Sequence, residues 1–139
     1  MNKEKERTNL IYVAHPYGGL EENRLKIDHI MKWLVLEDES NVYLSPIHNF
    51  GFMYLTGDEY QKGLNICLRM LEQCDVLVLC GDWRASKGCK QEFDKAKEMG
   101  IPIYTFTEWK EHVNPKAALN NKIKRFVEEL IKRGDSFYE

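Results

Sequence analysis

Glu92 is the acidic residue whose position best suits chemistry. In a helix predicted for residues 88–99, it lies three residues after Cys89 and four before Ala96, so its carboxylate lies along the edge of the apolar face. Burying an acid is costly unless it is solvated or hydrogen-bonded, but helix dipoles favour negative charge near a helix start. An ionised carboxylate in a partly dry cleft suits a nucleophile or general base acting on a sugar carbon. The alternative is a boundary glutamate that is hydrogen-bonded to the loop at residues 81–87.

Two loops before predicted helices have the residue types of an anion site. Ser86 can cap the helix that follows it, and Gly88 lets a ligand approach the backbone closely. The run His-Pro-Tyr-Gly-Gly at residues 15–19 has two glycines in its turn, with Asn23 and Arg24 one turn later. Helix amides at such a place can bind phosphate. Neither GxGxxG nor GK[ST] occurs, so a dinucleotide fold and a P-loop are not indicated, and a glycine-rich turn without a ligand is the alternative.

The cysteines and histidines lack the spacing of metal ligands. The four cysteines are separated by 7, 6 and 9 positions, unlike the close pairs of zinc sites, and the four histidines form no HExxH motif. We therefore expect most cysteines to be core thiols in a reducing compartment. No metal and no cofactor is predicted.

Alternating strands and helices must position these residues. Short apolar runs predict strands at residues 9–14, 42–44, 76–80 and 103–106. Apolar residues at helical spacing predict helices at residues 20–36, 58–73 and 88–99, and a last helix that starts at Pro115 and stops at Gly134. Residues 47–57 are predicted to be a loop rich in aromatics, which either covers a flat ligand or simply packs under a long connection.

This alternation predicts an α/β fold. We expect a doubly wound, flavodoxin-like three-layer α/β/α domain with a four- or five-stranded parallel sheet. Its ligand should bind beyond the carboxyl ends of the strands, where the loops at residues 15–19, 45–57 and 81–88 meet. The domain is expected to cover residues 9–134, between a flexible tail at residues 1–8 and a second tail at residues 135–139.

Composition excludes several other functions. The 139 residues suit one domain, and 20 basic against 22 acidic residues give a net charge of −2, which is unlike a protein that binds nucleic-acid polymers. No apolar run approaches the roughly 18 residues that span a bilayer, and the charged start resembles no secretion signal. We expect a cytoplasmic protein without a membrane partner.

Several motifs together resemble the nucleoside 2-deoxyribosyltransferase superfamily, which includes the nucleoside 5′-monophosphate N-glycosidases. The resemblance covers residues 9–106, and within the superfamily the sequence looks closest to a poorly characterised branch. Its most specific part runs from the buried strand at residues 76–80 through Trp83, Ser86, Gly88 and Glu92 to the Gly-Ile-Pro turn at residues 100–102. The motifs are Ile-Tyr-Val-Ala-His-Pro-Tyr-Gly-Gly at residues 11–19, Leu-Glu-Gln-Cys-Asp at residues 71–75 and Gly-Asp-Trp-Arg-Ala-Ser-Lys-Gly-Cys-Lys-Gln-Glu at residues 81–92.

The resemblance implies an enzyme that cleaves the N-glycosidic bond of a deoxynucleoside or its 5′-monophosphate, with transfer of the sugar to a base or to water. It implies that Glu92 is the nucleophile, that Tyr12 lies beside it, and that Ser86 and the glycine loop meet phosphate. The residues expected to bind substrate are His15, Tyr17, Gly18, Gly19, Asn23, Cys67, Trp83, Ser86 and Gly88.

Cys67 departs from the family pattern. It stands eight residues before Asp75, where the family enzymes usually have an aspartate, and a thiol is a poor general acid. Asp58, Glu59 or His48 could supply the proton, although their spacing singles out none of them. The alternative function is therefore a non-catalytic module that keeps a nucleotide pocket. By analogy with the family we also expect a homodimer or higher homo-oligomer, with Phe137 and Tyr138 either reaching a neighbour's pocket or lying in a frayed tail.

Overall fold

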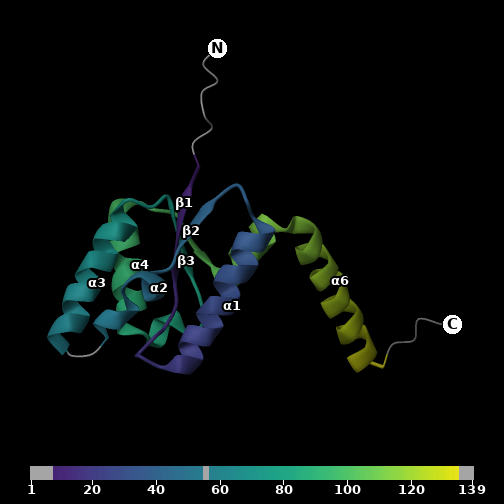
Figure 1. The fold of residues 1–139 in the computed structure, drawn as a ribbon. Coiled ribbons are helices and arrows are strands. Elements are labelled where there is room, and N and C mark those ends of the chain that lie inside the picture. Colours follow the sequence, from purple (N-terminus) through teal and green to yellow (C-terminus); the bar gives the residue numbers. More distant parts are fainter. Residues whose placement is uncertain (1–7, 55–56, 135–139) are drawn as a thin grey trace, which may run out of the picture. The chain divides into compact units, whose positions relative to one another are not determined.

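A four-stranded parallel sheet forms the centre of the fold. The computed structural model describes residues 8–54 and 57–134. The strands β1 (Leu10–Ala14), β2 (Val42–Leu44), β3 (Val76–Leu79) and β4 (Ile103–Thr105) lie in the order β2-β1-β3-β4, and all neighbours are parallel. This confirms the predicted doubly wound α/β class (Figure 1).

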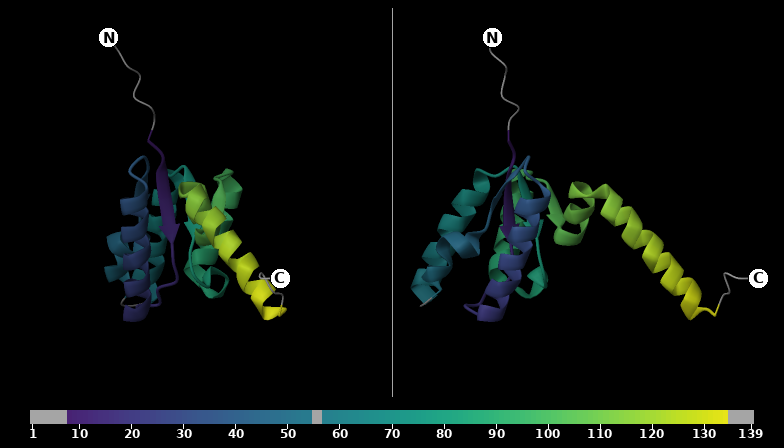
Figure 2. Two further views of the ribbon diagram at one scale, coloured as in Figure 1. Left: turned by 90° about the vertical axis from the view of Figure 1, so that its right-hand side faces the viewer. Right: turned by 45° about the vertical axis from the view of Figure 1, so that its right-hand side comes forward.

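Helices cover both faces of the sheet. Helix α1 (Glu21–Glu37) buries Ile27 and Leu34 on one side, while α3 (Gly57–Glu72) and α4 (Lys87–Met99) pack against each other on the other side (Figure 1). The turned views of Figure 2 show α1 running alongside β1. The chain crosses to the other face between β2 and β3, so the order of the strands reverses between β1 and β3. This is the switch point at which such sheets bind ligands.

The core beneath α3 and α4 includes a tyrosine in the middle of the central strand. Because side chains alternate along a strand, Tyr12 and Ala14 of β1 point to the same face. They pack in one cluster with side chains from β3, α3 and α4: Cys67, Leu71, Cys74, Leu77, Leu79, Cys89 and Ala96. The four cysteines are buried free thiols, as the sequence predicts.

Two helical segments differ from the predictions. The segment predicted as a loop at residues 47–57 begins with α2 (Pro46–Phe50) and the single 3₁₀ turn η1 (Gly51–Met53), because the Ser45 hydroxyl caps α2 and Pro46 is its first residue. The last strand ends at Thr105 rather than at residue 106. The chain continues directly into α5 (Phe106–Val113), a helix that is not among the predicted elements.

The chain forms two compact units, residues 1–106 and 107–139. The first holds the whole sheet and the candidate site. The second holds α6 (Pro115–Lys132), which confirms the predicted last helix. Within this unit its apolar stripe is not covered: Leu119, Ile123, Phe126 and Ile131 are each more than half exposed, at 59%, 53%, 63% and 62%. The inclusion of this helix in a single domain over residues 9–134 stays a prediction.

The predicted tails fall almost entirely outside the described residues, and Phe137 and Tyr138 lie there too. Within the described part of the chain, no helix combines the length and the apolar character needed to cross a bilayer.

Candidate active site

A buried carboxylate at the edge of a pocket is the centre of the candidate site. Glu92, in α4, is only 5% exposed, yet it lines a pocket that opens to solvent, which we call the Glu92 pocket. Tyr12 lies beside it, fully buried in β1. Among the described residues, neither the Tyr12 hydroxyl nor Glu92 Oε2 has a hydrogen-bond partner of standard geometry. A buried polar atom without a partner is costly, so Glu92 Oε2, whose residue lines the pocket, is a candidate to meet a ligand, whereas the Tyr12 hydroxyl lies beneath it beside the carboxyl group.

The start of α4 determines where Glu92 lies. The Ser86 hydroxyl accepts a hydrogen bond from the Cys89 amide (3.2 Å) and so caps the helix, as the sequence predicts. Glu92 stands three residues after Cys89, on the buried face of α4 with Cys89 and Ala96. Ser86 and Gly88 both line the Glu92 pocket. The local sequence therefore places a helix start and a carboxylate at one cavity.

Burial controls the charge of Glu92. Loss of solvation raises the pKa of its carboxyl group from 4.5 to about 7, and the neighbouring Tyr12 hydroxyl opposes part of that rise. The pKa of Tyr12 is itself raised well above its ordinary value by burial and by the adjacent carboxylate, so the phenol keeps its proton. Near neutral pH the site thus holds comparable amounts of ionised and protonated Glu92, next to a neutral hydroxyl donor.

Cys67 lies on α3 at the same pocket. Burial and the nearby Glu92 raise the pKa of its thiol to about 12. The same two causes raise the pKa of the Cys89 thiol, which lines the same pocket, to about 12. Both groups are therefore neutral thiols at physiological pH, with little capacity to give or take a proton.

Aromatic side chains from three segments form one wall of the Glu92 pocket. Tyr54 lies edge-on to Tyr17 (ring centroids 4.8 Å apart) and to Tyr60 (4.7 Å), and all three line the pocket with Phe50. Burial and Tyr60 raise the pKa of Tyr54. The aromatic load of residues 47–57 is evident in the sequence, but no spacing connects Tyr54 with Tyr60 before the chain folds.

Two glycines keep this wall close to the helices beneath it. A Cβ at Gly63 would lie 2.7 Å from the Cβ of Met53, so α3 and η1 approach one another only because the position is glycine. A Cβ at Gly88 would lie 3.2 Å from the Tyr60 hydroxyl and would project toward the pocket.

His15 stands between the Glu92 pocket and a second depression. It is 7% exposed and lines both of them. We call the second depression the outer hollow; it is also lined by Asn23, Lys26, Asp82 and Ser86. Its Nδ1 lies 2.6 Å from the carbonyl oxygen of Pro16. Burial and the charge of Lys26 lower the pKa of His15, partly offset by this bond, so the imidazole is neutral near pH 7.

The glycine loop after β1 folds back on the start of α1. Gly18 and Gly19 have φ values of 61° and 73°, which favour glycine, and the Asn23 side-chain amide donates to the Tyr17 carbonyl (2.9 Å). Gly18 and Asn23 line a surface depression with Ser86, while Gly19 lines a neighbouring depression. The structure thus brings the loop to the mouth of the Glu92 pocket.

Trp83 lies apart from the other predicted site residues. Its ring packs on Phe93 (centroids 4.9 Å apart), and the Arg84 guanidinium lies 4.7 Å from the Trp83 ring centroid. It does not belong to the lining described above for the Glu92 pocket or the outer hollow. These contacts fix the loop before Ser86.

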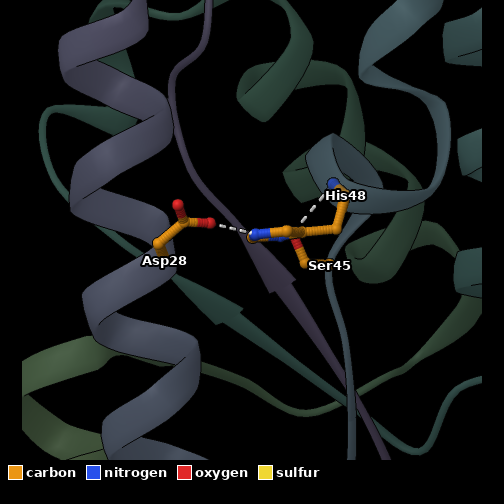
Figure 3. A network of polar contacts seen from close by, with 3 residues as sticks. All are labelled: Asp28, Ser45 and His48. Atoms are coloured by element: carbon orange, nitrogen blue, oxygen red, sulfur yellow. Dashed lines mark hydrogen bonds and ion pairs between the residues drawn. The ribbon is translucent and has the colours of Figure 1, made fainter.

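A relay of polar groups holds α2 against α1. Figure 3 shows His48 between Asp28 and Ser45. His48 Nε2 donates to the Asp28 carboxylate, and His48 Nδ1 lies 2.7 Å from the Ser45 hydroxyl. The order resembles that of a serine nucleophile with its base, but Ser45 is only 3% exposed, which leaves no room for a substrate at its oxygen. The relay instead positions α2, whose Ile47 and Phe50 line the Glu92 pocket.

No group of three or more His, Cys, Asp or Glu side chains that could hold a metal occurs within residues 8–54 and 57–134.

Comparison with known proteins gives a family and a fold. A family model described as "Domain of unknown function (DUF4406)" matches residues 9–105. No curated protein matches the sequence. A solved structure of a 2-deoxyribosyltransferase from the psychrotolerant bacterium Bacillus psychrosaccharolyticus is similar, with a TM-score of 0.55 and 18% identity over 69% of this chain and 70% of the other. At this identity the similarity shows a shared fold.

Proposed function

The chain belongs to the DUF4406 family, a domain of unknown function, and we propose that it cleaves the N-glycosidic bond of a deoxynucleoside or a deoxynucleoside 5′-monophosphate. The observation that carries the proposal is Glu92: a carboxylate that is 5% exposed, with an unpartnered oxygen, in a pocket with tyrosine walls. The fold shared with a 2-deoxyribosyltransferase supports the same chemistry.

In the proposed reaction, a Glu92 oxygen attacks the anomeric carbon of the sugar. The bond between that carbon and the base nitrogen breaks, and the base leaves with the electron pair and takes up a proton from solvent water. The product of this step is a sugar ester of Glu92, which an acceptor base or water then releases. The neutral Tyr12 hydroxyl lies where it can orient the attacking carboxylate and stabilise it when it is regenerated.

The surrounding residues fit the parts of such a substrate. The edge-on tyrosines 17, 54 and 60 form an aromatic surface for a flat base. Ser86, the start of α4 and the loop containing Gly18 and Gly19 offer hydroxyl and amide donors for a 5′-phosphate. In the proposal His15, Asn23, Gly88 and Cys67 contact the substrate, and Trp83 acts through the loop that it supports.

Release of free base tests this function directly. The protein is incubated with a panel of deoxynucleosides and their monophosphates, with and without an added acceptor base, and free and exchanged bases are separated by chromatography. Release in the wild type and in Asp94→Asn, an exposed acid two residues away in α4, together with loss in Glu92→Gln, would support the proposal. Release that continues in Glu92→Gln would refute Glu92 as the nucleophile.

Cys67 favours a second candidate, a nucleotide-binding module without turnover. The neutral thiol stands in the pocket where the related enzymes usually have an aspartate, so protonation of the leaving base has no evident donor there. In this case deoxynucleotides would bind, with calorimetric signals unchanged in Glu92→Gln, and no base would be released from any member of the panel.

The proposal includes a homo-oligomer in the cytoplasm that acts on a small nucleoside or nucleotide. The exposed apolar stripe of α6, with Phe126 at 63% exposure, provides a surface that association would cover. Light scattering of the wild type and of Phe126→Asp tests it, because the substitution would shift the mass toward that of one chain.

A further inference from the structure

The imidazole of His15 has one occupied and one available nitrogen. A carbonyl oxygen only accepts hydrogen bonds, so the contact of 2.6 Å with Pro16 requires that Nδ1 carry a proton. In the neutral ring Nε2 then has a free lone pair. No hydrogen bond to Nε2 from any described residue occurs; the ring lines both the Glu92 pocket and the outer hollow, and Nε2 lies on the side of Gly81, where an added Cβ would be 3.3 Å from it. The backbone of residue 16 therefore fixes the tautomer in which Nε2 is the basic nitrogen, at the boundary between the two depressions.

Burial and the charge of Lys26 disfavour a protonated His15. Lys26, from α1, lines the outer hollow next to the ring and disfavours a positive imidazole, as does burial. Asp82, from the loop after β3, lines the same hollow, and Glu92, from α4, lines the pocket on the other side. A proton taken up on Nε2 would thus be formed between two carboxylates, one on each side.

The other titratable groups beside Glu92 are poor bases. Tyr12, Cys67 and Cys89 all keep their protons at neutral pH because their pKa values are raised. Once Glu92 is joined to the sugar, its carboxylate is no longer available to accept a proton. His48, on the other side of α2, has Nε2 committed to Asp28.

We propose that His15 is the general base that activates water for hydrolysis of the sugar ester on Glu92, which makes the protein primarily a hydrolase rather than a transferase. This rests on the proposed function. In the step, Nε2 takes one proton from water while the water oxygen bonds to the anomeric carbon. The bond between that carbon and the Glu92 oxygen breaks, and Glu92 leaves as the carboxylate. The imidazolium then loses its proton through the outer hollow, which opens to solvent.

The variant His15→Asn separates this step from the first one. The Asn side-chain amide is a donor of about the reach of Nδ1, so it can keep the bond to the Pro16 carbonyl, but it has no basic nitrogen. His29→Asn, an exposed histidine on α1, is the matched control. Rapid-quench measurement of released base gives a burst for the first step and a steady rate for the second, and intact mass shows whether a sugar remains on the protein.

Under the proposal, His15→Asn keeps a burst close to one base per chain, accumulates a chain that carries one sugar, and loses about 10²- to 10⁴-fold in steady rate. Azide, an anion that needs no deprotonation, restores turnover by forming the glycosyl azide. The control behaves as the wild type. An unchanged steady rate in His15→Asn, or burst and steady rate that fall together without azide rescue, would overturn the role of His15. Absence of base release and of sugar adduct in the wild type would instead overturn the proposed function itself.

Discussion

Replacing Glu92 by glutamine should stabilise the protein, and by an amount that depends on pH. The native carboxyl group has a pKa of about 7, against 4.5 when it is exposed. Between these values the native chain binds a proton that the unfolded chain releases, so the free energy of unfolding falls as pH rises from about 4.5 and levels off above pH 7. Glutamine has the shape of the protonated acid and does not titrate.

The size of the effect follows from the same two values. A tenfold change in proton affinity corresponds to about 1.4 kcal/mol, so the wild type should lose about 3 kcal/mol of stability across this range through Glu92 alone. Because the carboxylate is only 5% exposed, solvent screening reduces this little. Glu92→Gln should therefore equal the wild type near pH 4 and exceed it by about 3 kcal/mol above neutrality.

Urea unfolding, followed by circular dichroism from roughly pH 4 to pH 8.5, measures the difference. Asp94→Asn, an exposed acid in the same helix, controls for the loss of one negative charge. Curves of Glu92→Gln and wild type that stay parallel over the whole range would show that Glu92 is solvated in the native protein, and the buried nucleophile would then have no physical basis.

Substitutions at three further positions, Tyr12, Ser86 and Gly63, test the surroundings of Glu92. Tyr12→Phe removes the hydroxyl that lowers the pKa of Glu92, so the rise of base release with pH should move upward by up to about 1 pH unit; a pH profile that does not move would contradict the contact. Ser86→Ala removes the cap of α4 and should cost about 1 kcal/mol in urea unfolding, whereas Ser86→Asp should keep the cap and selectively weaken binding of monophosphates over nucleosides. Equal loss for both ligands would argue against phosphate at this position. Gly63→Ala places a methyl group against Met53 and should lower stability by about 1 to 3 kcal/mol, while Gly57→Ala, with open space around it, should not; melting temperatures of the two variants compare them directly.

The sheet and its main helices could be predicted because their patterns are local. Continuous apolar runs mark β1 and β3, and helical spacing marks α1, α3 and α4 within one or two residues of their observed ends. The short α2 is not predicted, although Pro46 begins it as Pro115 begins α6. Five residues are too few for a helical period to show.

The pocket was only partly predictable. Glu92 could be singled out because its spacing conflicts with the apolar face of its own helix. Tyr54 and Tyr60 could not, since their meeting with Tyr17 depends on how η1 and α3 approach one another at Gly63. The exposure of the α6 stripe was likewise not predictable, because periodicity identifies an apolar face but not what covers it.

The Asp28–His48–Ser45 relay holds one wall of the Glu92 pocket independently of the residues that are proposed to break the bond. The proposed nucleophile and its tyrosine belong to α4 and the central strand, where a substitution disturbs the whole sheet. Ile47 and Phe50, which line the same pocket, belong to α2, a short helix that the relay fastens to α1. A chain that keeps this fastening can exchange the side chains of α2 at small cost to the sheet, so the part of the substrate that α2 contacts should vary while the proposed bond cleavage stays the same.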